Sequence, residues 1–378
     1  MKFIVSSSSL AQTLQAIGKV ISNKSPLPIL DYFLFNLSGG KLYVTASDIE
    51  TTLVATLEVE NVGGEDGLVA VPARRIQDSL KEFAEQPLTL DIDSLSWDIT
   101  ISWRSGKLSL AGITGCGYPE QQVLDSETLN SATFATSILA QGISTTIFAT
   151  ADNSLRPVMN GINVAISTQD ITFVATDAHR LVRVINSSVK GAENSSFILP
   201  AKPAHLLRSI LPKDDSIEVT VEFDSKNVVF TLPSYKMICR QIEGNYPDYN
   251  SAIPLNNDNK LTIDRLEFLA SLRRVSVCSS QASGLIRLSL TPEGIAITAQ
   301  DLSFNTSAED NIACQYVGED MEIGFKAQFL IDILSNLSTS EVFVELSDPT
   351  RPGLFCPVDS TDEEVSLLML LMPMMVNA

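Results

Sequence analysis

The feature that most limits how this chain folds is an internal repeat with a period of about one third of its length. Three segments share one order of patterns: a helix-like stretch, a loop, a pair of strands, and a strand that ends in aspartate. The aspartates are Asp48, Asp177 and Asp301, which recur at nearly equal intervals along the 378 residues. Because a chain of this length has room for two or three domains, the repeat indicates three equivalent ones.

A second landmark repeats at the same interval. In each segment a short apolar strand leads into a second helix-like stretch, and the junctions are Pro72, Pro200 and Phe325. Two independent landmarks with one period argue against a chance similarity. The predicted domains are residues 1–125, 126–256 and 257–378.

Each repeat combines two kinds of hydrophobic pattern. Strands are predicted where apolar and polar residues alternate, as in 41–47 and 171–177. Helices are predicted where apolar residues recur three and four apart, as at Leu10, Leu14 and Ile17. The predicted helices are 10–21, 73–84, 137–150, 201–211, 264–277 and 326–337. Two helices against antiparallel sheets in each repeat indicate an α+β fold.

Composition excludes several classes of protein. A hydrophobic content of 44% with 19% charged residues indicates a folded chain. The N-terminal segment lacks the apolar stretch of a secretory signal, and no run approaches the ~18 apolar residues of a membrane span. The five cysteines are far apart and form no CxxC pair, so neither a disulfide framework nor a zinc site is indicated. We expect a cytoplasmic protein without membrane association, metal or cofactor.

The net charge of −19 argues against a nucleic-acid partner only if the charge is evenly distributed. It is not. The six predicted helices hold ten basic and five acidic residues, a net charge of +5, whereas the rest of the chain holds 16 basic and 40 acidic residues, or −24. The helices therefore form a basic set within an acidic protein.

Basic helices suit contacts with phosphates, which are independent of base sequence. The alternative is that these are ordinary exposed helix positions. The candidate DNA-binding residues on the helices are Lys19, Arg74, Arg75, Lys81, Lys202, Arg208, Arg265, Arg273 and Arg274.

Five short motifs follow one another along the threefold repeat. They are LPIL at 27–30, ATDAHRL at 175–181, YPDY at 246–249, MEIGF at 321–325 and MPM at 372–374. Together with the threefold repeat, they make the whole chain similar to the bacterial replicative sliding clamp, the beta subunit of DNA polymerase III. Each motif alone is weakly specific, and their order and spacing make the resemblance strong.

The resemblance implies a head-to-tail homodimer that closes into a ring of six similar domains, with helices around the hole and sheets outside. Such a ring is a non-catalytic processivity factor that encircles double-stranded DNA topologically and without sequence specificity. It tethers the replicative polymerase catalytic subunit, is opened by a separate clamp-loader complex, and serves other polymerases and repair proteins with short clamp-binding motifs. Lys24 would be a further DNA contact.

The resemblance also implies a groove for partner peptides. Its residues would be Met159, Thr176, Ala178, His179, Arg180, Leu181, Pro247, Met372, Pro373 and Met374. The sequence departs from the family pattern at Ala178, where a glycine is usual, at Ser251, where an arginine is frequent, and in its longer C-terminal tail. The alternative for the MPM motif is a buried terminal strand.

For the seam between two subunits, the resemblance implies Leu108 and Leu110 on one side and Val277 and Cys278 on the other. An exposed apolar edge strand is an aggregation hazard, and pairing across a dimer would remove it. The alternative is that the two leucines face the core of their own domain.

Asp177 and His179 allow a rival interpretation, a hydrolase or transferase on a repeated α+β scaffold. No GxSxG, Walker A, HExxH or GxGxxG motif accompanies them, and Asp177 occupies a repeated position, which indicates a structural role. A third interpretation, an interaction scaffold that never meets DNA, conflicts with the charge distribution. We therefore predict no catalytic residue.

Overall fold

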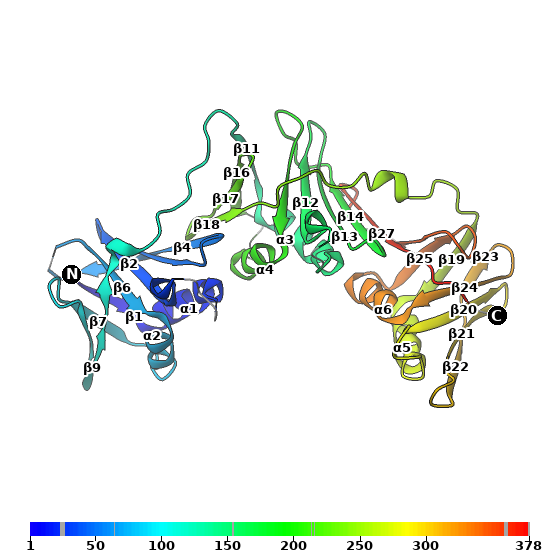
Figure 1. Ribbon diagram of the computed structural model, residues 1–378, viewed down its shortest axis with the longest axis horizontal. Helices are drawn as coiled ribbons and strands as arrows, with labels where there is room; N and C mark the ends of the chain where they lie inside the picture. The colour runs from blue at the N-terminus through cyan, green and yellow to red at the C-terminus, as the bar shows by residue number, and fades with distance from the viewer. Residues whose placement is uncertain are drawn as a thin grey trace. The chain divides into compact units, whose positions relative to one another are not determined.

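The computed structural model describes residues 1–22, 27–63, 65–152, 155–212, 214, 216–358 and 362–376. The chain divides into two compact units. Unit 1 is Met1–Ser137 with Lys202–Gln241, and unit 2 is Ile138–Ala201 with Ile242–Ala378. The middle repeat is thus shared, one half of it folding with the first repeat and the other half with the third (Figure 1).

Unit 1 holds a five-stranded sheet, β5-β1-β7-β8-β9, and a nine-stranded sheet, β10-β6-β2-β3-β4-β18-β17-β16-β11. Its strands are β1 (Lys2–Ser6), β2 (Tyr32–Ser38), β3 (Lys41–Ser47), β4 (Thr51–Glu58), β5 (Glu60–Asn61), β6 (Gly67–Pro72), β7 (Pro87–Ile92), β8 (Asp98–Trp103), β9 (Gly106–Ala111), β10 (Ile113–Thr114), β11 (Asn130–Ala135), β16 (Glu218–Phe223), β17 (Asn227–Thr231) and β18 (Tyr235–Arg240). Its helices are α1 (Ser7–Ile17), α2 (Ala73–Leu80) and α4 (Ala201–Ile210), with short 3₁₀ turns at Gly18–Val20, Pro28–Asp31 and Gly115–Gly117.

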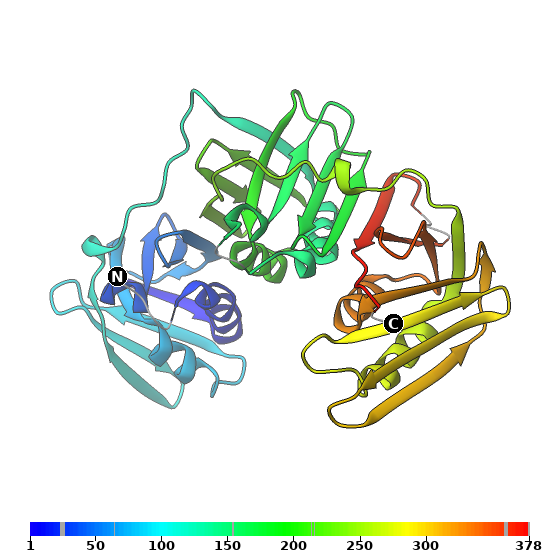
Figure 2. The ribbon, with the colours of Figure 1, turned by 45° about the vertical axis from the view of Figure 1, so that its right-hand side comes forward.

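Unit 2 holds a nine-stranded sheet, β15-β12-β13-β14-β27-β26-β25-β19-β23, and a four-stranded sheet, β22-β21-β20-β24. Its strands are β12 (Gly161–Ile166), β13 (Ile171–Thr176), β14 (Arg180–Asn186), β15 (Ser195–Pro200), β19 (Asn259–Asp264), β20 (Leu285–Thr291), β21 (Gly294–Asp301), β22 (Thr306–Ile312), β23 (Gln315–Val317), β24 (Met321–Lys326), β25 (Glu341–Leu346), β26 (Gly353–Pro357) and β27 (Val365–Leu371). Its helices are α3 (Thr136–Thr146), α5 (Arg265–Ser276) and α6 (Ala327–Asn336), with 3₁₀ turns at Ile147–Ala149, Pro157–Met159 and Asn250–Ala252. Figure 2 shows α6 in orange between red β27 and the yellow four-stranded sheet.

All strand pairs are antiparallel, and each nine-stranded sheet crosses a boundary between repeats. In unit 1, β4 pairs with β18, so that Thr52 lies opposite Ile238. In unit 2, β14 pairs with β27, so that Val182 lies opposite Met369. Main-chain hydrogen bonds therefore join neighbouring repeats, and the predicted combination of helices with antiparallel sheets is confirmed.

The predicted apolar faces of the helices are buried, and the predicted helix ends need small corrections. In α1, Leu10, Leu14 and Ile17 are fully buried, but the helix starts at Ser7, because the Ser6 side chain accepts a hydrogen bond from the Ser9 amide. Helix α2 ends at Leu80, before the predicted 84. The chain must leave the helix there, because the residues that follow pair with the start of α1 through Ser7.

The repeated aspartates close the turns that join paired strands. Oδ1 of Asp48 accepts the Thr51 amide at 2.7 Å, and Oδ1 of Asp177 accepts the Arg180 amide at 2.8 Å. Oδ1 of Asp301 accepts an amide two residues further along its turn at 2.9 Å. The repeat is therefore a repeated side-chain cap on a hairpin turn, which explains why aspartate recurs there without catalysis.

The turn after Asp48 is strained, which gives a first prediction. Ile49 has φ of 81°, where β-branched side chains clash with the backbone. Because glycine adopts this φ without a clash, Ile49→Gly is expected to stabilise unit 1 by about 1 kcal/mol. Urea unfolding monitored by tryptophan fluorescence reports this unit, because Trp97 and Trp103 both belong to it.

Glu50→Gly is the matched control, since Glu50 is the next residue of the same turn and does not have a positive φ. That variant is expected to lower stability by roughly 0.5–1 kcal/mol, the ordinary cost of glycine. Equal destabilisation by both substitutions would show that the turn is not strained at Ile49.

Candidate partner-binding and DNA-binding surfaces

The turn between β13 and β14 meets the C-terminal tail through main-chain contacts. Arg180 lies opposite Leu371 at the end of the β14–β27 ladder, and the Met372 amide donates a hydrogen bond to the His179 carbonyl at 2.8 Å. Ala178 and His179 are exposed in the turn, and Met372 is 38% exposed in the tail. We refer to the surface made by residues 177–179 and 372–374 as the turn–tail surface.

An apolar cluster adjoins this surface. Its buried members are Val174, Leu181, Leu354 and Leu370, and the partly buried side chains packed on it are Tyr246, Tyr249, Ile253 and Leu368. Burial raises the pKa of the Tyr246 phenol above its ordinary value, so this side chain stays neutral. Of the predicted groove residues, only Leu181 belongs to the cluster, and Pro247 lies between its two tyrosines.

Arg180 is a structural anchor more than an exposed groove residue. Its Nε donates to Asp177 Oδ2 at 3.0 Å and its Nη1 to Asp332 Oδ2 at 2.5 Å. The guanidinium carbon lies 4.6 Å from the ring centre of Phe329, and the side chain is 11% exposed. The His179 ring stacks on the same phenylalanine at 6.0 Å. Asp177 therefore orients Arg180 within the turn, and Asp332 and Phe329 hold it on α6.

The remaining predicted groove residues divide by exposure. Met159 and Thr176 are buried, at 7% and 6% exposed, and the Thr176 hydroxyl donates to the Arg180 carbonyl at 2.8 Å. The Thr176 side chain therefore supports the turn from within the protein. Pro373 and Met374 are partly exposed, so the interpretation of the MPM motif as a fully buried strand is wrong for these residues. No sequence signal points to Phe329, which comes from the third repeat. Tyr246 and Tyr249 belong to the YPDY motif, although only Pro247 of that motif is a predicted groove residue.

The turn after β3 has the same main-chain frame. The Arg240 amide donates to the Glu50 carbonyl at 2.8 Å, as the tail does to the later turn. Here, however, the Gln122 side-chain amide donates to the Ile49 carbonyl at 3.1 Å, and Lys202 forms an ion pair with the turn aspartate. Polar side chains therefore contact the turn at Asp48, whereas apolar and aromatic side chains surround the turn at Asp177.

The predicted DNA-binding residues differ in whether other groups of the protein already engage their charged side chains. Arg265 is less available for DNA contact than the others, because its guanidinium donates to the Thr339 and Leu334 carbonyls at 2.6 and 3.1 Å and supports the end of α6. Lys24 lies outside the described residues. The other eight are exposed.

Half of these eight are engaged by carboxylates. Lys81 and Arg74 lie 2.8 and 4.0 Å from Asp78, Arg274 lies 2.5 Å from Asp310, and Lys202 pairs with Asp48. Within the described part of the chain, the following form no ion pair: Lys19, Arg75, Arg208 and Arg273. These four are the strongest candidates for phosphate contacts.

The predicted seam residues are only partly exposed. Val277 is 83% exposed, and Cys278 and Leu108 are half-buried. Leu110 is 8% exposed and faces the core of its own unit, so the prediction that it lies at the surface is wrong. Leu108 and Leu110 are two residues apart in strand β9 and therefore face the same side of the sheet, where Leu110 is more deeply buried than Leu108.

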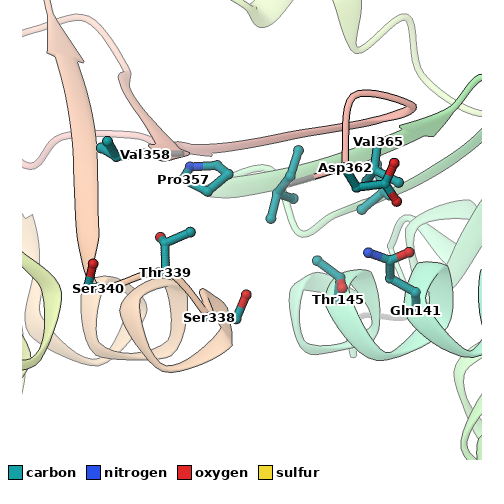
Figure 3. Close-up of a pocket in the computed structure, with 11 residues that line it drawn as sticks. Gln141, Thr145, Ser338, Thr339, Ser340, Pro357, Val358, Asp362 and Val365 are labelled. Atoms are coloured by element: carbon teal, nitrogen blue, oxygen red, sulfur yellow. The ribbon is translucent and has the colours of Figure 1, made fainter. Parts of the chain in front are cut away.

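A polar cavity of about 390 Å³ lies elsewhere in unit 2, between α3 and the loop after α6 (Figure 3). Gln141 and Thr145 face residues 338–340 across it, and Asp362 is its one acidic side chain. Within the described residues, no three His, Cys, Asp or Glu side chains are grouped so as to hold a metal ion. No helix in that part of the chain is long and apolar enough to cross a membrane.

Three family models match the chain in succession. They describe the N-terminal, central and C-terminal domains of the DNA polymerase III beta subunit and match residues 1–122, 133–248 and 250–375. The chain belongs to the DNA polymerase III beta subunit family. Members of this family are sliding clamps for DNA polymerase III and have no catalytic activity of their own, so the prediction of a non-catalytic clamp is confirmed.

Relatives and solved structures agree with this membership. The beta sliding clamp of Synechococcus elongatus is 26% identical over 392 residues, which cover 100% of both chains. That of Pseudomonas aeruginosa is 26% identical and covers 96% of this chain and 97% of its own. The sliding clamp of Bartonella birtlesii, solved bound to griselimycin, has a TM-score of 0.91 at 26% identity, with full coverage of both chains. The beta subunit of Thermotoga maritima has a TM-score of 0.89 at 25% identity, with the same coverage.

The ion pairs on α2 give a second prediction. Lys81 holds the pKa of the Asp78 carboxyl below its ordinary value by a side-chain hydrogen bond, so this carboxylate stays charged and competes with phosphate at neutral pH. Asp78→Asn frees Lys81 and Arg74 and is expected to raise the salt concentration that releases the protein from DNA by roughly 1.5-fold. Retention on nicked circular plasmid across a salt series measures this.

Asp348→Asn is the matched control. It removes the same charge and frees Arg351, which lies 3.3 Å away in a loop outside the predicted DNA-binding helices. If both variants shift the release point equally, the effect comes from net charge, and α2 is not a DNA-binding surface.

Proposed function

We propose that two copies of this chain close head-to-tail into a ring by pairing strand β9 of one copy with strand β22 of the other. One observation carries this proposal: the two sheets that cross repeat boundaries within the chain have nine strands each, whereas the outer sheets have five and four. Strand β9 is an edge of the five-stranded sheet and β22 an edge of the four-stranded sheet. Their pairing would make a third sheet of nine strands.

Chemistry at the two edges supports this pairing. An unpaired edge presents free main-chain amides and carbonyls to any other strand, and a closed ring removes that hazard. Leu108 on β9 and Val277 and Cys278 after α5 supply half-buried or exposed apolar groups near these edges. Because each copy has one edge of each kind, two such contacts close a dimer of six domains.

The ring would hold duplex DNA by topology and by weak phosphate contacts. Lys19, Arg75, Arg208 and Arg273 are exposed, and they would contact phosphates without reading base sequence. The acidic remainder of the protein would repel DNA from every other surface. A cytoplasmic location follows from this DNA partner.

The turn–tail surface would bind short peptides of the replicative polymerase catalytic subunit, the clamp-loader complex, and other polymerases and repair proteins. Its support is the exposed His179 and Met372 and the partly exposed Met374 beside an apolar cluster, a combination that suits peptides with apolar anchors. Methionine side chains adapt to different partners because the unbranched thioether changes shape at little cost.

Release of DNA on linearisation tests the ring directly. Protein loaded onto nicked circular plasmid by a bacterial clamp loader with ATP is expected to stay bound through gel filtration at moderate salt. It should dissociate when a restriction enzyme cuts the circle, because a ring slides off a free end. Retention on the linear product would instead indicate an ordinary DNA-binding patch and overturn the proposal.

Removal of the tail tests the partner surface. Deletion of the residues after Leu371 is expected to abolish binding of a fluorescein-labelled pentapeptide with two leucines and a phenylalanine, measured by anisotropy. The dimer should persist in sedimentation velocity, since β9 and β22 remain. Undiminished peptide affinity in the truncated protein would exclude the turn–tail surface as the binding site.

A further inference from the structure

We infer that Gly324 is a positioning residue for the partner surface, because it lets the C-terminal tail cross strand β24 and so fixes Met372 and Met374 in place. This inference rests on the proposed peptide-binding function of the turn–tail surface. It starts from the path of the tail after β27 ends at Leu371.

The tail is held at two main-chain points that lie in different parts of unit 2. The Met372 amide donates to the His179 carbonyl, and the Met374 amide donates to the Gly324 carbonyl, both at 2.8 Å. Met374 and Gly324 form an isolated antiparallel bridge. Residues 372–374 therefore connect the turn of the second repeat to an edge strand of the third.

The need for glycine at 324 comes from space and not from backbone conformation. Gly324 is not among the residues with positive φ, so another residue could adopt its backbone conformation. A methyl group added there would lie 2.8 Å from each of three atoms: the Met374 carbonyl oxygen, Cγ2 of Val376 and Cδ1 of Leu285. Contacts this short are far inside van der Waals distance, and one of them is with tail backbone.

The tail has an easier way to relieve this overlap than the strand does. Strand β24 is paired with β20 along its whole length, with Gly324 opposite Arg287. The tail near Gly324 has a single bridge, and Met375 beside it is 86% exposed. A larger side chain at 324 would therefore lift the tail and leave the sheet intact.

The length of the tail adds a second contact. Val376 lies two residues past the MPM motif, and its Cγ2 is one of the three atoms at Gly324. An apolar side chain of the tail thus packs over the glycine, which extends the anchor past the MPM motif. Two main-chain hydrogen bonds therefore hold the tail of the partner surface, and Gly324 accepts one of them.

Gly324→Ala tests the inference through two independent readouts on the full-length dimer. Hydrogen–deuterium exchange of the tail segment reports whether the Met374 amide has lost its acceptor. Anisotropy with the fluorescein-labelled pentapeptide reports the effect on binding. We expect faster exchange in the tail, unchanged exchange in β20 and β24, and about tenfold weaker peptide binding.

Gly318→Ala is the matched control, a glycine of the same repeat where an added methyl would overlap Asn259 and not the tail. It is expected to leave tail exchange and peptide affinity unchanged. A second variant, Gly324→Ala with Val376→Gly, removes one of the three overlaps and is expected to recover part of the tail protection.

The outcomes separate this inference from the proposed function. Slow tail exchange in Gly324→Ala would overturn the anchoring role. Fast exchange with full peptide affinity would overturn the positioning role and show that the tail does not need this anchor to bind. If the unmodified protein binds no peptide, the proposed function fails with the positioning role, and exchange alone still decides whether Gly324 anchors the tail.

Discussion

Main-chain pairing across the boundaries between repeats is the constraint on which the rest of this structure depends. Strand β4 pairs with β18 and strand β14 with β27, so each nine-stranded sheet belongs to two repeats at once. A hydrogen-bonded ladder costs much more to break than a contact between side chains alone. The middle repeat is consequently divided between two compact units, although the sequence repeat has three members.

The same pairing creates the candidate partner surface. At the end of the β14–β27 ladder, the tail must pass the capped turn at Asp177, and the carbonyl of His179 receives the first amide beyond the strand. Arg180, oriented by Asp177, then fixes the turn on α6 through Asp332. In unit 1 the equivalent ladder end is occupied by Gln122. The turns at Asp48 and Asp177 share one backbone arrangement, and only a few side chains around them differ.

The net charge of the protein conceals an uneven distribution of basic and acidic residues along the chain. The protein has a net charge of −19, yet eight of the nine candidate DNA-binding residues on the predicted helices are exposed. Four of these are engaged by carboxylates and four are not. Two of the four pair with the nearby Asp78, whereas Lys202 and Arg274 pair with aspartates of other elements, which the sequence could not reveal. Arg265 shows the same limit, since its acceptors are carbonyls more than 65 residues away.

The sequence by itself determined the number of repeats, the helices to within a few residues, and the family, because hydrophobic period and turn aspartates are local properties. It also located Ala178, His179 and the MPM motif as exposed or partly exposed positions. Only the tertiary structure decided that Leu110 is core, that Arg180 is an anchor, and that Phe329 and the tyrosines of the apolar cluster adjoin the partner surface. The reason is physical: these roles are set by strand register and by contacts between residues far apart in the chain, which no local pattern records.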